Sequence, residues 1–104
     1  MDTVNVVGMP PSSPQSHLVE WYRPDFTDVS VNEMVASLEM ATANSVSGDV
    51  RLIVSMAVPS DEVLYAVFEA ATTEAIVDVC DRAGLPPQRV TAQVDARIHV
   101  TRVS

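Results

Sequence analysis

Two apolar segments with only four residues between them place the strongest constraint on the fold of this 104-residue chain. Residues 50–58 and 63–70 are rich in β-branched and aromatic side chains, which favour strands. The connection, residues 59–62, has the sequence PSDE, and proline, serine and aspartate are typical of turns. Since so short a connection allows two strands to pair only in the antiparallel sense, the sequence predicts a β-hairpin in the middle of the chain.

A strand and a helix are predicted before this hairpin. Residues 17–23, with the sequence HLVEWYR, are typical of a strand that stops at Pro24. Ser30 and Glu33 have the spacing of a capping box, which satisfies free backbone N–H groups at a helix start, and Gly48 suits the left-handed helix end. Apolar residues recur between them at helical spacing: Val31, Met34, Val35, Leu38 and Ala41.

A second helix and a last strand are predicted after the hairpin. Thr72 is a suitable N-cap, Gly84 a suitable end, and Pro86 with Pro87 prevents the helix from continuing. Residues 90–100 then alternate between apolar and polar side chains, as a strand with one solvated face does. The apolar series is Val90, Ala92, Val94, Ala96, Ile98 and Val100, and the polar series is Thr91, Gln93, Asp95, Arg97 and His99.

The predicted order of elements is βαββαβ. Right-handed crossovers with both helices on one side give an α+β, ferredoxin-like sandwich, with a four-stranded antiparallel sheet of strand order 4-1-3-2. We predict one such domain over residues 17–104. Residues 1–16 are rich in proline and serine, and we predict a disordered tail there because such a composition buries too little apolar surface to offset the entropy of ordering.

Charge and cysteine content limit the classes of partner. Six basic and fourteen acidic residues give a net charge of −8, which repels phosphate backbones and anionic lipid, so we expect neither nucleic acid nor membrane partners. The apolar runs are too short to span a bilayer. A single cysteine, Cys80, excludes an internal disulfide, and the first residues lack the pattern of a signal peptide. A cytoplasmic location is therefore expected.

The sheet face away from the helices is the predicted working surface. Its mixture of charged, aromatic and aliphatic side chains is too apolar to be wholly solvated, which favours a homodimer interface or, as the alternative, a shallow ligand site. The residues predicted on it are Glu20, Tyr22, Arg51, Ile53, Ser55, Tyr65, Val67, Glu69, Gln93, Asp95, Arg97 and His99.

The stretch VFEAATTEAIVDVCDRAGLPPQRV, which begins at Val67, carries a family resemblance. It resembles the C-terminal half of a family of small bacterial ferredoxin-like proteins of unassigned activity, some of which are described as nickel-binding and dimeric. The likeness extends over most of the chain from Leu18 to Val94. It implies the same fold, a homodimer and nickel as a bound metal. The matching residues are Glu20, Val50, Arg51, Ser55, Val58, Phe68, Glu69, Ala70, Ala83, Gly84, Leu85, Pro86 and Arg89, whereas Ala66 stands where relatives often have a cysteine.

The metal ligands that this resemblance requires must come from the residues that the chain offers. His17 and His99 are its two histidines, and the predicted topology brings the start of the first strand beside the end of the fourth. Imidazole with a carboxylate suits nickel, zinc or copper, so His17, His99, Glu20 and Asp95 form the predicted metal site. The alternative is that His17, in phase with Val19 and Trp21, points away from His99 and is structural.

Two classes of function remain from the sequence. The favoured one is a small cytoplasmic homodimeric binding protein that takes nickel or another divalent transition metal. The alternative is a cofactor-free enzyme or ligand-binding protein of the dimeric ferredoxin-like type, related in manner to monooxygenases or isomerases. The first is favoured because such an enzyme needs polar groups turned into a pocket between sheet and helices, whereas the inward phase of the predicted strands is almost purely aliphatic.

Overall fold

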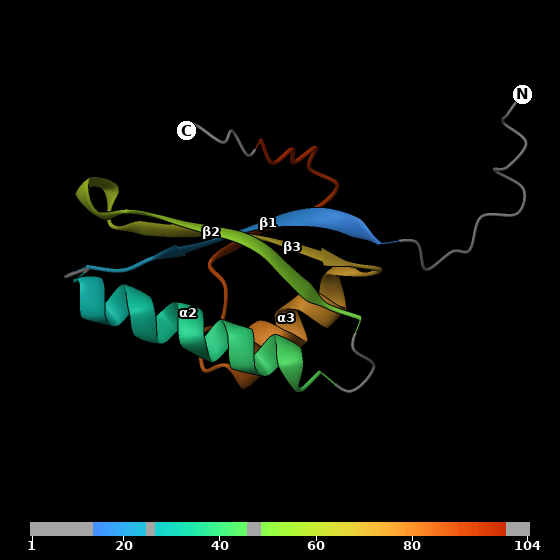
Figure 1. Ribbon diagram of the computed structural model, residues 1–104, viewed down its shortest axis with the longest axis horizontal. Coiled ribbons are helices and arrows are strands. Elements are labelled where there is room, and N and C mark those ends of the chain that lie inside the picture. Colours follow the sequence, from blue (N-terminus) through green and yellow to red (C-terminus); the bar gives the residue numbers. More distant parts are fainter. Residues whose placement is uncertain (1–13, 25–26, 46–48, 100–104) are drawn as a thin grey trace, which may run out of the picture.

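The computed structural model describes residues 14–24, 27–45 and 49–99. Four strands form one antiparallel sheet in the order β2-β3-β1-β4, which is the predicted order 4-1-3-2 read from the opposite edge. Figure 1 shows helices α2 and α3 together on one face of this sheet. The predicted α+β sandwich is therefore confirmed. Its elements are β1 (Gln15–Tyr22), α2 (Asp28–Ala43), β2 (Arg51–Val58), the short 3-10 helix η1 (Pro59–Asp61), β3 (Val63–Ala70), α3 (Thr73–Arg82) and β4 (Arg89–Thr91).

The core lies between the sheet and the two helices. Trp21 is its largest buried side chain, and its indole Nε1 donates to the carbonyl oxygen of Leu85 at 2.8 Å. This bond satisfies the polar atom of the ring and ties β1 to the loop after α3. The sheet and the helices supply the other fully buried apolar side chains, among them Val19, Leu38, Leu64, Phe68, Ile76, Val79 and Cys80.

The hairpin and the second helix agree with the sequence predictions. β2 and β3 pair in the antiparallel sense, and Glu62 closes the turn in the left-handed region at φ 55°. Thr72 is the N-cap of α3 and accepts from the N–H of Ala75 at 3.1 Å. Gly84 follows the helix at φ 76°, a conformation that a residue without a Cβ adopts at little cost.

The first strand and the first helix begin earlier than predicted. β1 begins at Gln15, so Gln15 and Ser16 belong to the sheet and not to the predicted tail. α2 begins at Asp28, because the capping box is formed by Thr27 and Ser30 instead of Ser30 and Glu33: the Thr27 hydroxyl accepts from the Ser30 N–H, and the Ser30 hydroxyl accepts from the Thr27 N–H. Residues 1–13 of the predicted tail, and Gly48, lie outside the described residues.

Strand β2 contains a β-bulge that the sequence does not reveal. Leu52 pairs with Phe68, but the next partner, Val67, pairs with Val54, so Ile53 is the extra residue. Side chains alternate between the two faces of a sheet, so one extra residue moves every later side chain of that strand to the opposite face. The prediction that Ser55 lies on the face away from the helices was therefore wrong, because Ser55 pairs with the core residue Ala66.

The predicted last strand, residues 90–100, is mostly absent. β4 comprises only Arg89–Thr91, and Gln93 takes a left-handed conformation at φ 57°, which interrupts the extended chain. Residues 94–99 are not part of a strand among the described residues, and Val100 lies outside them. In Figure 1 this C-terminal segment lies on the side of the sheet away from α2 and α3. Within the described ranges, no helix is long and apolar enough to cross a membrane.

Candidate binding surface on the open face of the sheet

The open face is the side of the sheet that turns away from α2 and α3. The strand register builds it in cross-strand rows, because residues paired across antiparallel strands point to the same side. One end has the row Ser16, Glu69 and Arg51; the next row is Thr91, Leu18, Val67 and Val54; the next is Arg89, Glu20, Tyr65 and Met56; the last is Tyr22, Val63 and Val58.

The middle of this face forms an apolar groove with a volume of about 340 Å³. Val54 and Met56, from the edge strand β2, are apolar side chains that are 42% and 58% exposed. A patch of this kind is typical of a binding surface. The groove is lined by Leu18, Val54, Met56, Tyr65, Ala66 and Val67.

A buried carboxylate lies beside the groove. Glu20 pairs directly with Tyr65 across the sheet and is only 6% exposed. Its Oε1 accepts from the Tyr22 hydroxyl at 2.5 Å, and its Oε2 lies 3.8 Å from Nε of Arg89. The bond to the carboxylate raises the pKa of Tyr22 above its ordinary value of 10.0, because ionising the hydroxyl would remove the donated proton beside a negative charge. Tyr22 is therefore a neutral donor at physiological pH.

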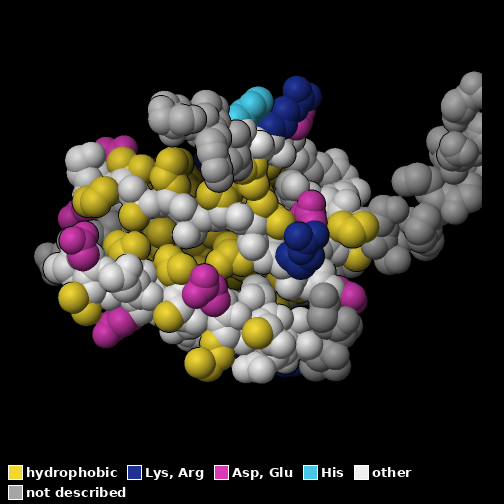
Figure 2. All heavy atoms as spheres, viewed as in Figure 1, with side chains coloured by type: hydrophobic (Ala, Val, Ile, Leu, Met, Phe, Trp, Pro, Cys, Tyr) yellow, Lys and Arg dark blue, Asp and Glu magenta, His cyan; other side chains and the backbone are white. Residues whose placement is uncertain are grey.

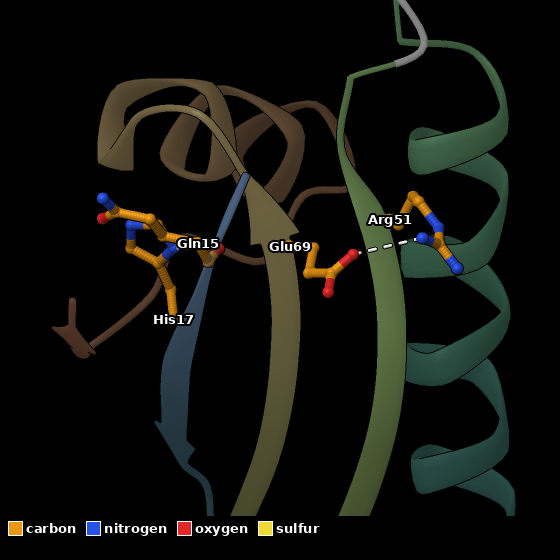
Figure 3. Close-up of polar contacts among 4 residues, drawn as sticks. All are labelled: Gln15, His17, Arg51 and Glu69. Carbon is orange, nitrogen blue, oxygen red and sulfur yellow. Dashed lines mark hydrogen bonds and ion pairs between the residues drawn. The ribbon is translucent and has the colours of Figure 1, made fainter. Parts of the chain in front are cut away.

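An exposed ion pair lies at the other end of the open face. Nη1 of Arg51, on β2, lies 3.1 Å from Oε1 of Glu69, on β3 (Figure 3). The arginine side chain is 71% exposed, so solvent screens this pair and it contributes little to stability. The open face thus has one charged end, and the Glu20 and Arg89 pair lies in the same cross-strand row as the groove residues Tyr65 and Met56.

The four predicted metal ligands lie in different environments. His17 lies at the start of β1 beside Gln15 (Figure 3), and its Nδ1 is 3.0 Å from the Gln15 carbonyl oxygen. It is 2% exposed and in phase with Val19 and Trp21, so its ring belongs to the helix side of the sheet. This is the structural alternative that the sequence left open.

The other three candidates do not join His17. Glu20 lies on the open face, whereas His99 is exposed beyond the end of β4. Asp95 forms an ion pair with Arg97, whose Nη2 lies 3.0 Å from Oδ2. Among residues 14–24, 27–45 and 49–99, no group of three or more histidine, cysteine or acidic side chains is close enough to hold a metal ion. The four predicted ligands thus lie apart in the described chain, and the nickel site stays a prediction.

Cys80 lies in the core and not at the surface. Burial, with a smaller contribution from Asp81, raises the pKa of its thiol to about 12. The thiolate is the form that attacks electrophiles and binds metals, so at neutral pH Cys80 is an apolar core residue.

Sequence reasoning missed several residues of this surface, among them Leu18, Val54, Met56 and Arg89. Val54 and Met56 were assigned to the wrong side because periodicity does not reveal a bulge. Arg89 was predicted to precede the last strand, but it is the first residue of β4 and faces Glu20. The signal that was present is the cluster of opposite charges on strands predicted to be neighbours, Glu20 on the first and Arg89 at the start of the fourth.

Comparison with known proteins yields one solved structure. No family model matches the chain, and no curated protein matches it. A crystal structure of the protein SCO4226 from Streptomyces coelicolor A3(2) aligns with 80% of this chain and 99% of its own length, with a TM-score of 0.65 and 18% sequence identity. At that identity, the likeness shows that the two chains share a fold.

Proposed function

We propose that this protein is a small cytoplasmic homodimeric binding protein whose two copies meet across the open face of the sheet. The apolar groove, flanked by the buried Glu20 carboxylate, is the observation that supports the proposal. An isologous contact would cover Val54 and Met56 of both copies, which a monomer leaves in water. The exposed Arg51 and Glu69 pair at one end of the face, and the exposed Arg89 on β4, would then form part of the polar rim that a typical interface has.

The ligand that best suits the groove is small and apolar, with one hydrogen-bond donor or positive charge. The lining side chains supply dispersion contacts, and the carboxylate of Glu20 accepts a proton donor, since its contact with Arg89 is long. Such a ligand would lie between the two copies and be shielded from water by both.

Nickel binding, which the family resemblance implies, is the second candidate. A nickel site needs three or more donors, and one copy does not gather them within the described residues. Glu20 is the predicted ligand on the open face, where a twofold axis brings a second copy of each side chain close. We therefore propose that any nickel site lies between copies and includes Glu20.

Native mass spectrometry of protein purified without an affinity tag tests all three parts of this proposal. The expected result is a dimer that carries added mass from a ligand or a metal ion, and that loses the added mass in a Glu20→Ala variant. Arg51→Ala, at the solvated end of the same face, is the matched control and should retain it. A monomer without added mass at all concentrations contradicts the proposal.

A further inference from the structure

The segment after β4 has the sequence pattern of a strand, but among the described residues it pairs with no other strand. Beyond the left-handed turn at Gln93, the N–H of Val94 donates to the carbonyl oxygen of Ser16 at 2.9 Å, and this is the last bond to β1 among the described residues. Residues 95–99 are all exposed. We call residues 95–99 the C-terminal arm.

The sequence of the arm alternates between polar and apolar residues, as that of a strand does. Asp95 and Arg97 form a double contact, with Nε and Nη2 of the arginine 3.1 and 3.0 Å from the two carboxylate oxygens, so they lie on the same side of the arm. Ile98 alternates with them and is 56% exposed. In an extended conformation the arm would have one side on which charges neutralise each other and one apolar side, and within the described residues no backbone hydrogen bond is recorded for residues 95–99.

The edge of β2 is the complementary surface. β2 is the outermost strand on its side, so its outer backbone groups have no strand partner within the described residues. The bulge at Ile53 interrupts the edge, and residues 54–58 form its regular part. Figure 2, in which β2 lies toward the viewer, shows apolar side chains gathered along this side of the molecule. An exposed apolar edge strand is a template for pairing with another chain.

We propose that the arm of one copy adds as a strand to residues 54–58 of β2 in a second copy, and that the exchange is reciprocal. This inference rests on the homodimer proposed above, and it adds strand pairing between the arm and β2 to the contacts between the two copies. The arm's own β2 is excluded as its partner, because β4 and β2 are opposite edges of one sheet with β1 and β3 between them. In Figure 1 the arm lies on the open side of the sheet, where the partner copy would be.

The size of the open face supports this exchange. Strands lie about 4.8 Å apart and rise about 3.3 Å per residue, so the three long strands, each of eight residues, span roughly 14 by 26 Å. Each partner of a standard interface buries about 800 Å² of accessible surface, whereas the projected area of this rectangle, without β4, is roughly 370 Å². Two arms, each laid along the partner's edge, add contact area and backbone hydrogen bonds that the flat faces do not supply.

Amide hydrogen–deuterium exchange tests directly whether the arms pair with the partner copy. Peptides that cover residues 54–58 and 95–99 are followed in the unchanged protein and in Val67→Lys, which places a charge in the centre of the open face. The expected result is slow exchange in both peptides of the dimer and a joint loss of protection in the monomeric variant. If the unchanged protein is a dimer whose arm is not protected, this inference is wrong and the proposed homodimer stands. If the unchanged protein is a monomer, the proposed homodimer itself is wrong. Protection of the arm that persists in a monomeric variant identifies docking within one copy and also overturns this inference.

A proline substitution tests the backbone bonds separately. Successive N–H groups of an extended chain point to opposite sides, so the N–H of Arg97 points away from the side on which Val94 meets β1. Arg97→Pro removes that donor from both arms and should raise the dimer dissociation constant about tenfold or more. Arg97→Ala removes the same ion pair but keeps the N–H, and it should have a much smaller effect. Equal dissociation constants for the two variants would show that the arm does not pair as a strand.

Discussion

Glu20 is the residue that connects the fold to the candidate function. Its carboxylate is almost fully buried on the open face and accepts from the Tyr22 hydroxyl. We predict that Glu20→Gln lowers the pKa of Tyr22 toward 10, because the negative charge that opposes ionisation is removed. Ultraviolet titration near 295 nm measures this, and Tyr22→Phe identifies the signal that remains as Tyr65. An unchanged titration curve in Glu20→Gln would contradict the contact.

Cys80 gives a prediction about stability at high pH. The folded-state pKa of about 12 exceeds the ordinary thiol value of 9.0, so the folded protein holds the proton more tightly than the unfolded chain. The stabilisation is fully present below pH 9 and is lost as the pH rises from 9 toward 12, by on the order of 1 kcal/mol per unit. Urea unfolding at pH 7 and pH 10 should therefore show a smaller pH-dependent loss in Cys80→Ala than in the unchanged protein. Equal losses in the two proteins would rule out this role for the thiol.

Helix α2 provides a prediction at the scale of the element. The Thr27 and Ser30 side chains each accept from the other's N–H at the helix start. Thr27→Ala should lower the free energy of unfolding by about 1 kcal/mol, the usual cost of a lost N-cap. Glu33→Ala, which removes the residue that the sequence assigned to the box, should change it much less. A larger effect from Glu33→Ala in denaturant titrations would support a helix that starts at Ser30.

The elements also show what the sequence was able to predict. The β2 and β3 hairpin, α3 and the strand order follow from local signals, namely turn residues, the Thr72 cap and the Gly84 stop, and the structure confirms each of them. The bulge at Ile53 and the interruption at Gln93 have no such signal. Each is decided by how two strands fit, which depends on residues distant in the sequence.

The candidate site was predicted only in part for the same reason. The open face and its residues Glu20, Tyr65 and Val67 follow from strand alternation on β1 and β3, which are regular. The groove residues Val54 and Met56 lie after the bulge, so periodicity placed them on the wrong side. The predicted metal ligands depended on the last strand extending to His99, and that strand ends at Thr91.

At the scale of the whole molecule, the two faces of the sheet differ in how they are covered. α2 and α3 bury one face, whereas the described residues leave an apolar groove on the other. The protein carries a net charge of −8, which opposes close association of two copies at low ionic strength. The proposed dimer therefore depends on apolar burial at the centre of the open face, where Val67 lies between Leu18 and Val54.

Sedimentation velocity of the unchanged protein and two lysine variants tests this dependence most directly. Val67→Lys leaves two unpaired charges at the centre of a symmetric contact, whereas Val29→Lys places the same charge on α2, away from the open face, at a side chain that is already 64% exposed. We predict a mass of twice the 11.2 kDa chain for the unchanged protein and for Val29→Lys, and a single chain mass for Val67→Lys with an unchanged circular dichroism spectrum. A single chain mass for the unchanged protein at high concentration, or a dimer that persists in folded Val67→Lys, would contradict association through the open face.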